Sequence, residues 1–525
     1  MRRSAVLGPA GTLLASTLVA GAIAAPRATA DGPYRQSTET YGVKTAAQRA
    51  AKQGIDWADC PADWGLEKPI QCGCVSVPLD YARPDGKQIR IAVDRIGNTG
   101  TAEERQGALV YNPGGPGASG LRFPRRVVTG NALWAGVAKA YDFVGFDPRG
   151  VGRSSPLSCV DPQAPRTAPK PDPVPGSEAD KLAGRKLAAE YAAGCAERGG
   201  DLLPHLTTLN TARDLDVIRA ALGERRLNFL GVSYGTYLGA VYATLFPAHV
   251  RRMVMDSVVN PRTDKIWYGV NLDQNGAFER RLTDWMTWIA AHDDVFGIGD
   301  TEAEVRRQWE KLRAEAKRSP IGGVVGPAEL VDHFQSAPYY DTQWAPVARV
   351  WSSYLAGDPQ PLIDAAGPHP EDTAGSAAAE NSTAVYTAVE CADAPWPTDW
   401  ETWDRDNTLL HAEHPFFTWS NAWLNLPCAT WPTKRQQPLE IRTGKGLPPV
   451  LLVQAERDAA TPYQGALELH KRLKGSRLVT EENAGSHGIT TLVNPCVNAK
   501  VEAYLLRGAL DGHDTVCAPH APPTP

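Results

Sequence analysis

Short apolar runs alternate with amphipathic helical stretches in the first half of the chain. Residues 89–93 alternate between apolar and polar positions, and residues 108–111 and 143–146 are short, continuous apolar runs. Continuous runs of this length are typical of strands that are buried on both faces of a parallel sheet. The same pattern predicts further strands at 227–230 and 252–255 and helices at 211–222 and 236–245.

The alternation returns near residue 448. Residues 450–453 and 477–480 have the pattern of buried strands, and residues 463–473 between them have that of a helix. Strands that alternate with helices predict a parallel sheet with helices on both faces. We therefore expect an α/β fold with a doubly wound, mostly parallel sheet, built from residues 46–259 and 441–525.

The stretch between these two parts, residues 260–440, has a different composition. Helices rich in alanine and charge are predicted at 277–291 and 301–318, and 12 of the 15 tryptophans lie in this stretch. We interpret it as a mainly helical cap inserted into the sheet domain. Its aromatic side chains either form the cap's own core or line a pocket for a peptide or acyl group.

The N-terminus has the features of an export signal. Arg2 and Arg3 precede an apolar run over residues 5–25, and small residues at 28–30 offer a cleavage site. Residues 1–30 are therefore predicted to be a signal peptide, and the protein to be secreted and free of the membrane after cleavage. A membrane anchor is the alternative, although Gly, Pro, Ser and Thr interrupt the run. Residues 31–45 are polar and could be a pro-segment or a flexible start.

The net charge and the cysteine content indicate which partners, compartment and metals to expect. The net charge of −5 and the lack of a basic block argue against a nucleic-acid partner. Nine cysteines agree with an oxidising compartment, and the close spacing of Cys72 and Cys74 is poor for zinc, so no metal is expected. Neighbours in sequence suggest the pairs Cys159–Cys195, Cys391–Cys428 and Cys496–Cys517, with Cys60 joined to Cys72 or Cys74 and one thiol left over.

Residues 231–235, Gly-Val-Ser-Tyr-Gly, match the nucleophile elbow, in which a serine occupies a sharp turn between a strand and a helix. The predicted strand at 227–230 and helix at 236–245 supply that setting. A pattern this short also arises by chance in ordinary glycine-rich turns. With strand and helix in place, Ser233 is the candidate nucleophile.

A serine hydroxyl needs a base and a group that orients the base. His487 is the candidate base, because it lies in a loop of small residues after the last predicted strand. The candidate acid is Asp458, which follows the strand at 450–453. Asp256 also follows a strand and precedes His487, and we interpret it as a structural loop acid.

A glycine-rich loop at 112–117 follows the predicted strand at 108–111. Its backbone could approach a substrate, and we expect the N–H groups of Gly115 and Tyr234 to form an oxyanion hole. A phosphate-binding loop is disfavoured because no Gly-Lys-Ser/Thr follows. Residues 147–154 carry charges that we expect to brace the site through an Asp–Arg network.

Taken together, the motifs at 112–117, 147–154 and 231–239 and the Asp458/His487 tail resemble the secreted tripeptidyl aminopeptidases of streptomycetes, which are α/β-hydrolases of the prolyl aminopeptidase family. The resemblance runs from about Trp57 to Cys517. It implies release of tripeptides from free N-termini through an acyl-enzyme, with no cofactor. The Asn112-Pro113 start of the glycine-rich loop differs from the prolyl aminopeptidase pattern.

A free N-terminus requires an anion to hold the substrate's ammonium group. Glu390 and Asp393 in the cap are the candidates, with an ordinary surface position as the alternative. Three other functions stay open: a prolyl aminopeptidase-type enzyme, an esterase or acyltransferase, and a non-catalytic secreted binding protein. We expect the protein to be a monomer.

Overall fold

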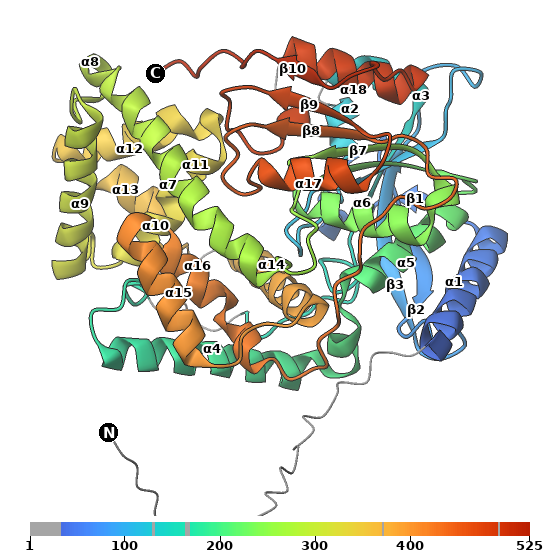
Figure 1. Ribbon diagram of the computed structural model, residues 1–525, viewed down its shortest axis with the longest axis horizontal. Coiled ribbons are helices and arrows are strands. Elements are labelled where there is room, and N and C mark those ends of the chain that lie inside the picture. The colour runs from blue at the N-terminus through green and yellow to red at the C-terminus, as the bar shows by residue number, and fades with distance from the viewer. Residues whose placement is uncertain (1–32, 129–131, 163–167, 370–371, 492–493) are drawn as a thin grey trace, which may run out of the picture.

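The protein is built around one mixed sheet, seen in a computed structural model that describes residues 33–128, 132–162, 168–369, 372–491 and 494–525 (Figure 1). The predicted signal peptide, residues 1–30, lies outside the described residues. The strands are β1 (Ala58–Asp59), β2 (Gln71–Pro78), β3 (Gln88–Ile96), β4 (Ala108–Asn112), β5 (Asp142–Phe146), β6 (Leu227–Val232), β7 (Val250–Asp256), β8 (Leu451–Ala455), β9 (Arg477–Glu481) and β10 (Thr515–Cys517).

The strand order is β1-β2-β3-β5-β4-β6-β7-β8-β9-β10. Strands β1, β2, β3 and β5 pair antiparallel, and every pair from β5 to β10 is parallel. All residues of β4, β6 and β8 are buried, as their continuous apolar runs predict. The mostly parallel sheet expected from the sequence is confirmed, and each predicted strand coincides with one of β3 to β9 to within two residues at its start.

Helices cover both faces of the sheet (Figure 1). One core lies under α1, α5, α6 and α17, and a second lies under α3 and α18. This two-sided cover is what a doubly wound sheet needs in order to remove its apolar side chains from water. The helices are α1 (Pro33–Gln53), α2 (Arg125–Val128), α3 (Ala132–Ala140), α5 (Thr208–Ala221), α6 (Tyr234–Leu245), α17 (Gln464–Arg472) and α18 (Pro495–Arg507).

Helix α1 corrects one expectation about the N-terminal region. Its residues Val43 and Ala46 are buried, and the helix packs on α5. Glu39 of α1 also pairs with Arg213 of α5 at 2.5 Å. The stretch at 31–45, expected to be a pro-segment or a flexible start, is helical from residue 33, and the apolar face of α1 belongs to the core of the sheet domain.

The stretch that we predict to be a cap, residues 260–440, is mainly helical, and its helices lie beside the sheet (Figure 1). Trp285, Trp309 and Trp351 are buried in its own apolar core. Helix α4 (Glu178–Gly199), from the chain between β5 and α5, also packs on this layer, which the sequence did not indicate. The other helices are α7 (Tyr268–Ala290), α8 (Asp293–Phe296), α9 (Glu302–Arg318), α10 (Pro327–Phe334), α11 (Ser336–Tyr339), α12 (Trp344–Leu355), α13 (Gln360–Ala366), α14 (Thr373–Asp393), α15 (Trp400–Glu413) and α16 (Thr418–Asn425).

Four disulfides connect parts of the fold. The structure selects Cys72 as the partner of Cys60, and Cys74 on the same strand is a half-buried free thiol. The other disulfides are Cys159–Cys195, Cys391–Cys428 and Cys496–Cys517, as expected.

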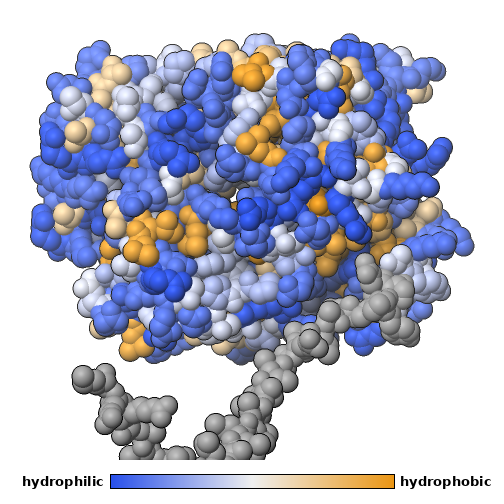
Figure 2. Space-filling view, viewed as in Figure 1, coloured by the Kyte–Doolittle hydropathy of each residue, from blue (hydrophilic) through white to orange (hydrophobic). Residues whose placement is uncertain are grey.

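Among the described helices, none is long and apolar enough to cross a bilayer. The face seen in Figure 2 is largely hydrophilic, with hydrophobic side chains in small separate groups.

Candidate active site

Ser233 occupies the turn between β6 and α6, as the elbow motif predicts. Its backbone has φ 59° and ψ −126°, a conformation that non-glycine residues adopt rarely and at a cost in free energy. A Cβ on Gly235 would lie only 2.5 Å from the backbone oxygen of Asn112, so the second glycine of the motif is required for close packing. The turn thus presents the serine at the carboxyl end of the parallel strands, where ligands bind in such sheets.

His487 and Asp458 form a buried pair at the same end of the sheet. His487 Nδ1 lies 2.8 Å and 3.0 Å from the two carboxylate oxygens of Asp458. The same carboxylate accepts hydrogen bonds from the backbone N–H groups of Ala460 and Thr461, at 2.9 and 3.0 Å, and from the Thr461 hydroxyl at 2.9 Å. These donors hold the carboxylate in one orientation toward the imidazole.

Strand β7 joins the serine turn to the histidine loop. The Ser233 N–H donates to the backbone oxygen of Asp256 at 2.9 Å, and the Gly488 N–H donates to the Ser257 hydroxyl at 2.8 Å. Because β7 pairs with both β6 and β8, it sets the spacing between the elbow and the loop that carries Asp458.

Asp256 braces the chain that follows the histidine. Its carboxylate accepts hydrogen bonds from the backbone N–H groups of Ile489 and Thr490, at 3.2 and 2.7 Å, and from the Thr490 hydroxyl at 2.5 Å. Burial raises its pKa to about 6. The contact with His487 Nδ1 is made by Asp458, and the geometry of Asp256 suits the structural role that we assigned to it.

The pKa of His487 is raised above its usual value. Burial lowers it, but the charge and hydrogen bond of Asp458, together with the charge of Asp256, outweigh the effect of burial. The imidazole is 7% exposed and the side chain of Asp458 fully buried, so little water screens the pair. The site therefore stabilises the protonated, imidazolium form of His487.

The glycine-rich loop packs directly on the serine turn. A Cβ on Gly114 would lie 2.8 Å from the Ser233 Cβ and 3.0 Å from the Tyr234 backbone nitrogen. Gly115 follows with φ 102°, a conformation that favours glycine. The loop thus brings its backbone next to Ser233, as an oxyanion hole requires.

The charged segment 147–154 contacts the residues that directly follow this loop. The Arg149 guanidinium donates two hydrogen bonds to Asp214 of α5, at 2.6 and 2.7 Å, and both side chains are almost fully buried. Asp147 accepts hydrogen bonds from Ser119, which follows the glycine-rich loop, and from the Arg153 backbone. These contacts brace the segment against α5 and the loop.

Glu390 and Asp393 are both buried, so the surface alternative for these two acids is wrong. The Asp393 carboxylate accepts hydrogen bonds from the backbone and hydroxyl of Thr208 at 2.9 and 2.5 Å, and the Thr208 hydroxyl also contacts the Tyr234 hydroxyl at 2.7 Å. Burial raises the pKa of Asp393 to about 7. Through Thr208, the Asp393 carboxylate is thus linked to Tyr234, the residue that follows Ser233.

The Glu390 carboxylate accepts fewer side-chain and backbone hydrogen bonds than the carboxylate of Asp393. The Asn271 amide donates to it at 3.0 Å, and burial raises its pKa to about 8, although Asn271 and Tyr386 oppose the shift. Burial also raises the pKa of Tyr234, followed by the charge of Asp393, and the charge of Glu390 makes a smaller contribution.

The structure places two tyrosines against His487 that the sequence did not single out. The Tyr339 ring meets the imidazole edge-on at 5.7 Å, and its backbone oxygen accepts from the His487 N–H at 2.9 Å. The Tyr340 ring lies 6.5 Å from the same imidazole. No motif marks these residues, because they reach the histidine only when the cap folds over the sheet.

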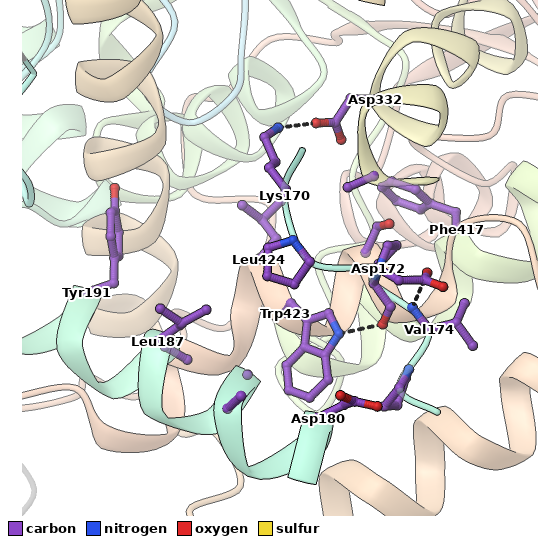
Figure 3. A pocket seen from close by; sticks show the side chains of 18 of the residues that line it. Lys170, Asp172, Val174, Asp180, Leu187, Tyr191, Asp332, Phe417, Trp423 and Leu424 are labelled. Carbon is purple, nitrogen blue, oxygen red and sulfur yellow. Dashed lines mark hydrogen bonds and ion pairs between the residues drawn. The ribbon is translucent and has the colours of Figure 1, made fainter. Parts of the chain in front are cut away.

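A pocket of about 880 Å³ lies elsewhere in the helical layer, between α4, α16 and the chain at 170–176 (Figure 3). Trp423 donates to the Pro173 carbonyl at 2.7 Å along its wall, and Lys170 pairs with Asp332 at its rim. None of Ser233, Asp458 and His487 lines it. Among the described residues, no group of three His, Cys, Asp or Glu side chains is placed to hold a metal ion.

Two family models match this chain. One, described as alpha/beta hydrolase fold, matches residues 107–318, and one described as TAP-like protein matches residues 414–517. The first match contains the serine turn, and the second contains both Asp458 and His487.

Curated relatives match the chain over nearly its full length. It is 68% identical over 530 residues to the tripeptidyl aminopeptidase of Streptomyces lividans, which covers 100% of this chain and 99% of the relative. It is 28% identical to the serine protease Hip1 of Mycobacterium tuberculosis, over 89% of this chain and 91% of that protein. It is 30% identical to a protein named carboxylesterase B from Mycobacterium tuberculosis, over 93% of this chain and 94% of that protein. The chain therefore belongs to the tripeptidyl aminopeptidase family of α/β-hydrolases.

Proposed function

We propose that this protein is a secreted serine exopeptidase that releases tripeptides from the free N-termini of peptides and proteins. The observation that carries the proposal is the strained Ser233 turn at the same end of the sheet as a buried Asp458–His487 pair, on loops that β7 holds together. The family of the chain, the four disulfides and the predicted signal peptide support a peptidase that works outside the cell.

In the proposed mechanism, Ser233 attacks the scissile carbonyl while His487 Nε2 accepts its proton. Asp458 holds Nδ1–H and stabilises the imidazolium that forms. His487 then returns the proton to the leaving amine, which leaves a peptidyl ester on Ser233. Water, activated by the same histidine, hydrolyses this acyl-enzyme and frees the tripeptide.

The tetrahedral intermediate carries a negative oxygen that needs hydrogen-bond donors. We assign the backbone N–H groups of Gly115 and Tyr234 to this role. The close packing of Gly114 on Ser233 and Tyr234 supports the assignment, because it brings the two backbones together beside the nucleophile.

We assign the substrate's ammonium group to Glu390 rather than to Asp393. Asp393 already accepts two hydrogen bonds from Thr208, whereas Glu390 is buried with weaker internal compensation. The ammonium group of a bound substrate would place a positive charge beside the Glu390 carboxylate and favour its ionised form.

The test combines a variant with an analysis of products. Ser233→Ala should reduce turnover of a tripeptide anilide by about 10⁴-fold or more while the protein stays folded. Mass spectrometry of a defined peptide should show products of three residues from its N-terminus. Single residues would instead indicate a prolyl aminopeptidase-type enzyme. Turnover by Ser233→Ala equal to that of the wild type would refute the assignment of the nucleophile.

A second panel separates peptidase from esterase, a function suggested by the name of the carboxylesterase B relative. Free tripeptide anilides, the same compounds with a blocked amine, and simple esters are compared as kcat/KM. A strong preference for the free amine supports the exopeptidase, and efficient turnover of simple esters alone contradicts it. Labelling of Ser233 by an organophosphonate tests the non-catalytic alternative.

A further inference from the structure

The C-terminal tail, residues 518–525, leaves the sheet at β10 and runs toward the helical layer (Figure 1). Its start is anchored, since β10 pairs with β9 and Cys517 is disulfide-bonded to Cys496. The Asn494 amide also donates to the Ala518 carbonyl at 3.0 Å. The tail therefore enters the space beside the histidine loop in a defined position.

His520 of this tail lies between two carboxylates from different layers. Its Nδ1 lies 2.8 Å from Glu481 Oε1, at the end of β9, and its backbone N–H donates to the same oxygen at 2.9 Å. Its Nε2 lies 3.1 Å from Asp341 Oδ2, in the chain between α11 and α12. One imidazole thus joins the sheet domain to the cap.

Asp341 belongs to the short cap segment that contacts the histidine loop. Its backbone N–H donates to the Ser486 hydroxyl at 2.9 Å, and two residues earlier the Tyr339 carbonyl accepts from the His487 N–H at 2.9 Å. The Asp341 carboxylate also pairs with Arg281 of α7. The segment 339–341 is therefore held by His520 on one side and holds the His487 backbone on the other.

Charge strengthens this connection. Hydrogen bonds to Asp341 and Glu481 outweigh burial and raise the pKa of His520 to about 10. Burial alone would raise the pKa of Asp341, but the His520 hydrogen bond and the Arg281 charge lower it. At neutral pH the tail imidazole is thus a cation between the side chains of Asp341 and Glu481. The His520 side chain is 14% exposed, and such a partly buried ion pair is screened less than one on the open surface.

We propose that His520 is a positioning residue for the catalytic histidine: it fixes segment 339–341, which in turn fixes the loop that carries His487. The inference rests on the proposed function, because it takes His487 as the general base. A base displaced by about 1 Å from the nucleophile can cost on the order of 100-fold in rate. The tail would then act on kcat through the cap, without contacting substrate.

The first test uses His520→Gln and a truncation that removes residues 519–525, which leaves the Cys496–Cys517 disulfide intact. Both should lower kcat for a tripeptide anilide by about 10- to 100-fold. KM should stay within about twofold, because the tail's described contacts do not involve α14, which carries Glu390. Rates are normalised to enzyme titrated with an organophosphonate, so unfolded protein does not count. His513→Gln, an exposed histidine earlier in the same region, is the matched control.

Rescue and coupling separate positioning from mere stabilisation. His520→Lys restores a cation beside Asp341 and should recover at least half of the lost kcat on a logarithmic scale. Adding Asp341→Asn to His520→Gln should lower kcat no further than the more damaging single change, because both break one connection.

Wild-type kcat in His520→Gln and in the truncated chain would overturn the inference, as would a loss of melting temperature without a change in kcat per titrated site. Equal kcat in the Lys and Gln variants would also overturn it. Failure of the proposed function is distinguishable, because Ser233→Ala would then still turn over the same anilide.

Discussion

Two buried carboxylates, Asp458 in the sheet domain and Glu390 in the cap, differ in how the protein compensates their charge. Asp458 accepts three hydrogen bonds from residues 460 and 461 and contacts His487. Glu390 is hydrogen-bonded by Asn271 and interacts with Tyr386. Both are out of water, so these internal donors must replace lost hydration.

The difference fits the roles that we propose for the two acids. A carboxylate that orients a catalytic base must stay in one place, and the donors around Asp458 hold it there. Glu390, with its pKa raised to about 8 by burial, is poised to gain from an incoming cation. In this view Glu390 gains a positively charged partner only when substrate binds, whereas Asp458 has its hydrogen-bond partners in the free protein.

The largest effect should come from removing the charge beside the histidine. Asp458→Asn should lower kcat/KM for a tripeptide anilide by about 10⁴-fold, because the imidazole loses both its orientation and its counter-charge. Asp256→Asn is the matched control and should lose about tenfold or less, since Asp256 contacts the chain after His487. Equal losses in steady-state kinetics would show that the two acids have been assigned the wrong way round.

Glu390→Gln should have the next largest effect. It removes the anion proposed for the substrate's ammonium, so kcat/KM for free-amine anilides should fall by about 100-fold. Amine-blocked anilides and simple esters should lose no more than about threefold. A uniform loss across all these substrates would contradict an amine anchor at this position.

Proton release provides an independent measurement on Glu390. With a pKa of about 8 it is mostly protonated at pH 7, and a bound ammonium favours the ionised form. Binding of a tripeptide anilide to Ser233→Ala at pH 7 should therefore release about one proton to the buffer. Calorimetry in buffers of different ionisation enthalpy measures this number. The double variant Ser233→Ala/Glu390→Gln should release almost none, and equal release would exclude Glu390 as the source.

The smallest effect should come from weakening the shell around Asp458. Thr461→Val removes the hydroxyl donor but keeps the Ala460 and Thr461 backbone donors, so kcat/KM should fall by about tenfold or less. A loss as large as that of Asp458→Asn would show that the backbone donors alone do not hold the carboxylate in place.

Local patterns in the sequence were sufficient for much of the fold. The strands at 108–111 and 227–230 and the helix after Ser233 follow from short apolar runs, glycines and helical periodicity, all of which act within a few residues. Helix α1 was missed because its buried face, Val43, Ala46, Ala47 and Ala50, has helical spacing but consists mostly of small alanines, which give only a weak apolar signal.

What the sequence by itself determined was the elbow at Ser233, the chain order of the proposed serine, acid and histidine, and the alternation that specifies a parallel sheet. Only the tertiary structure decided that Asp458 rather than Asp256 contacts His487, and that Cys60 pairs with Cys72. It alone placed Tyr339 against His487. The physical reason is distance along the chain: strand pairing and cap closure bring such residues together, and no local pattern encodes which of two similar side chains will meet a distant partner.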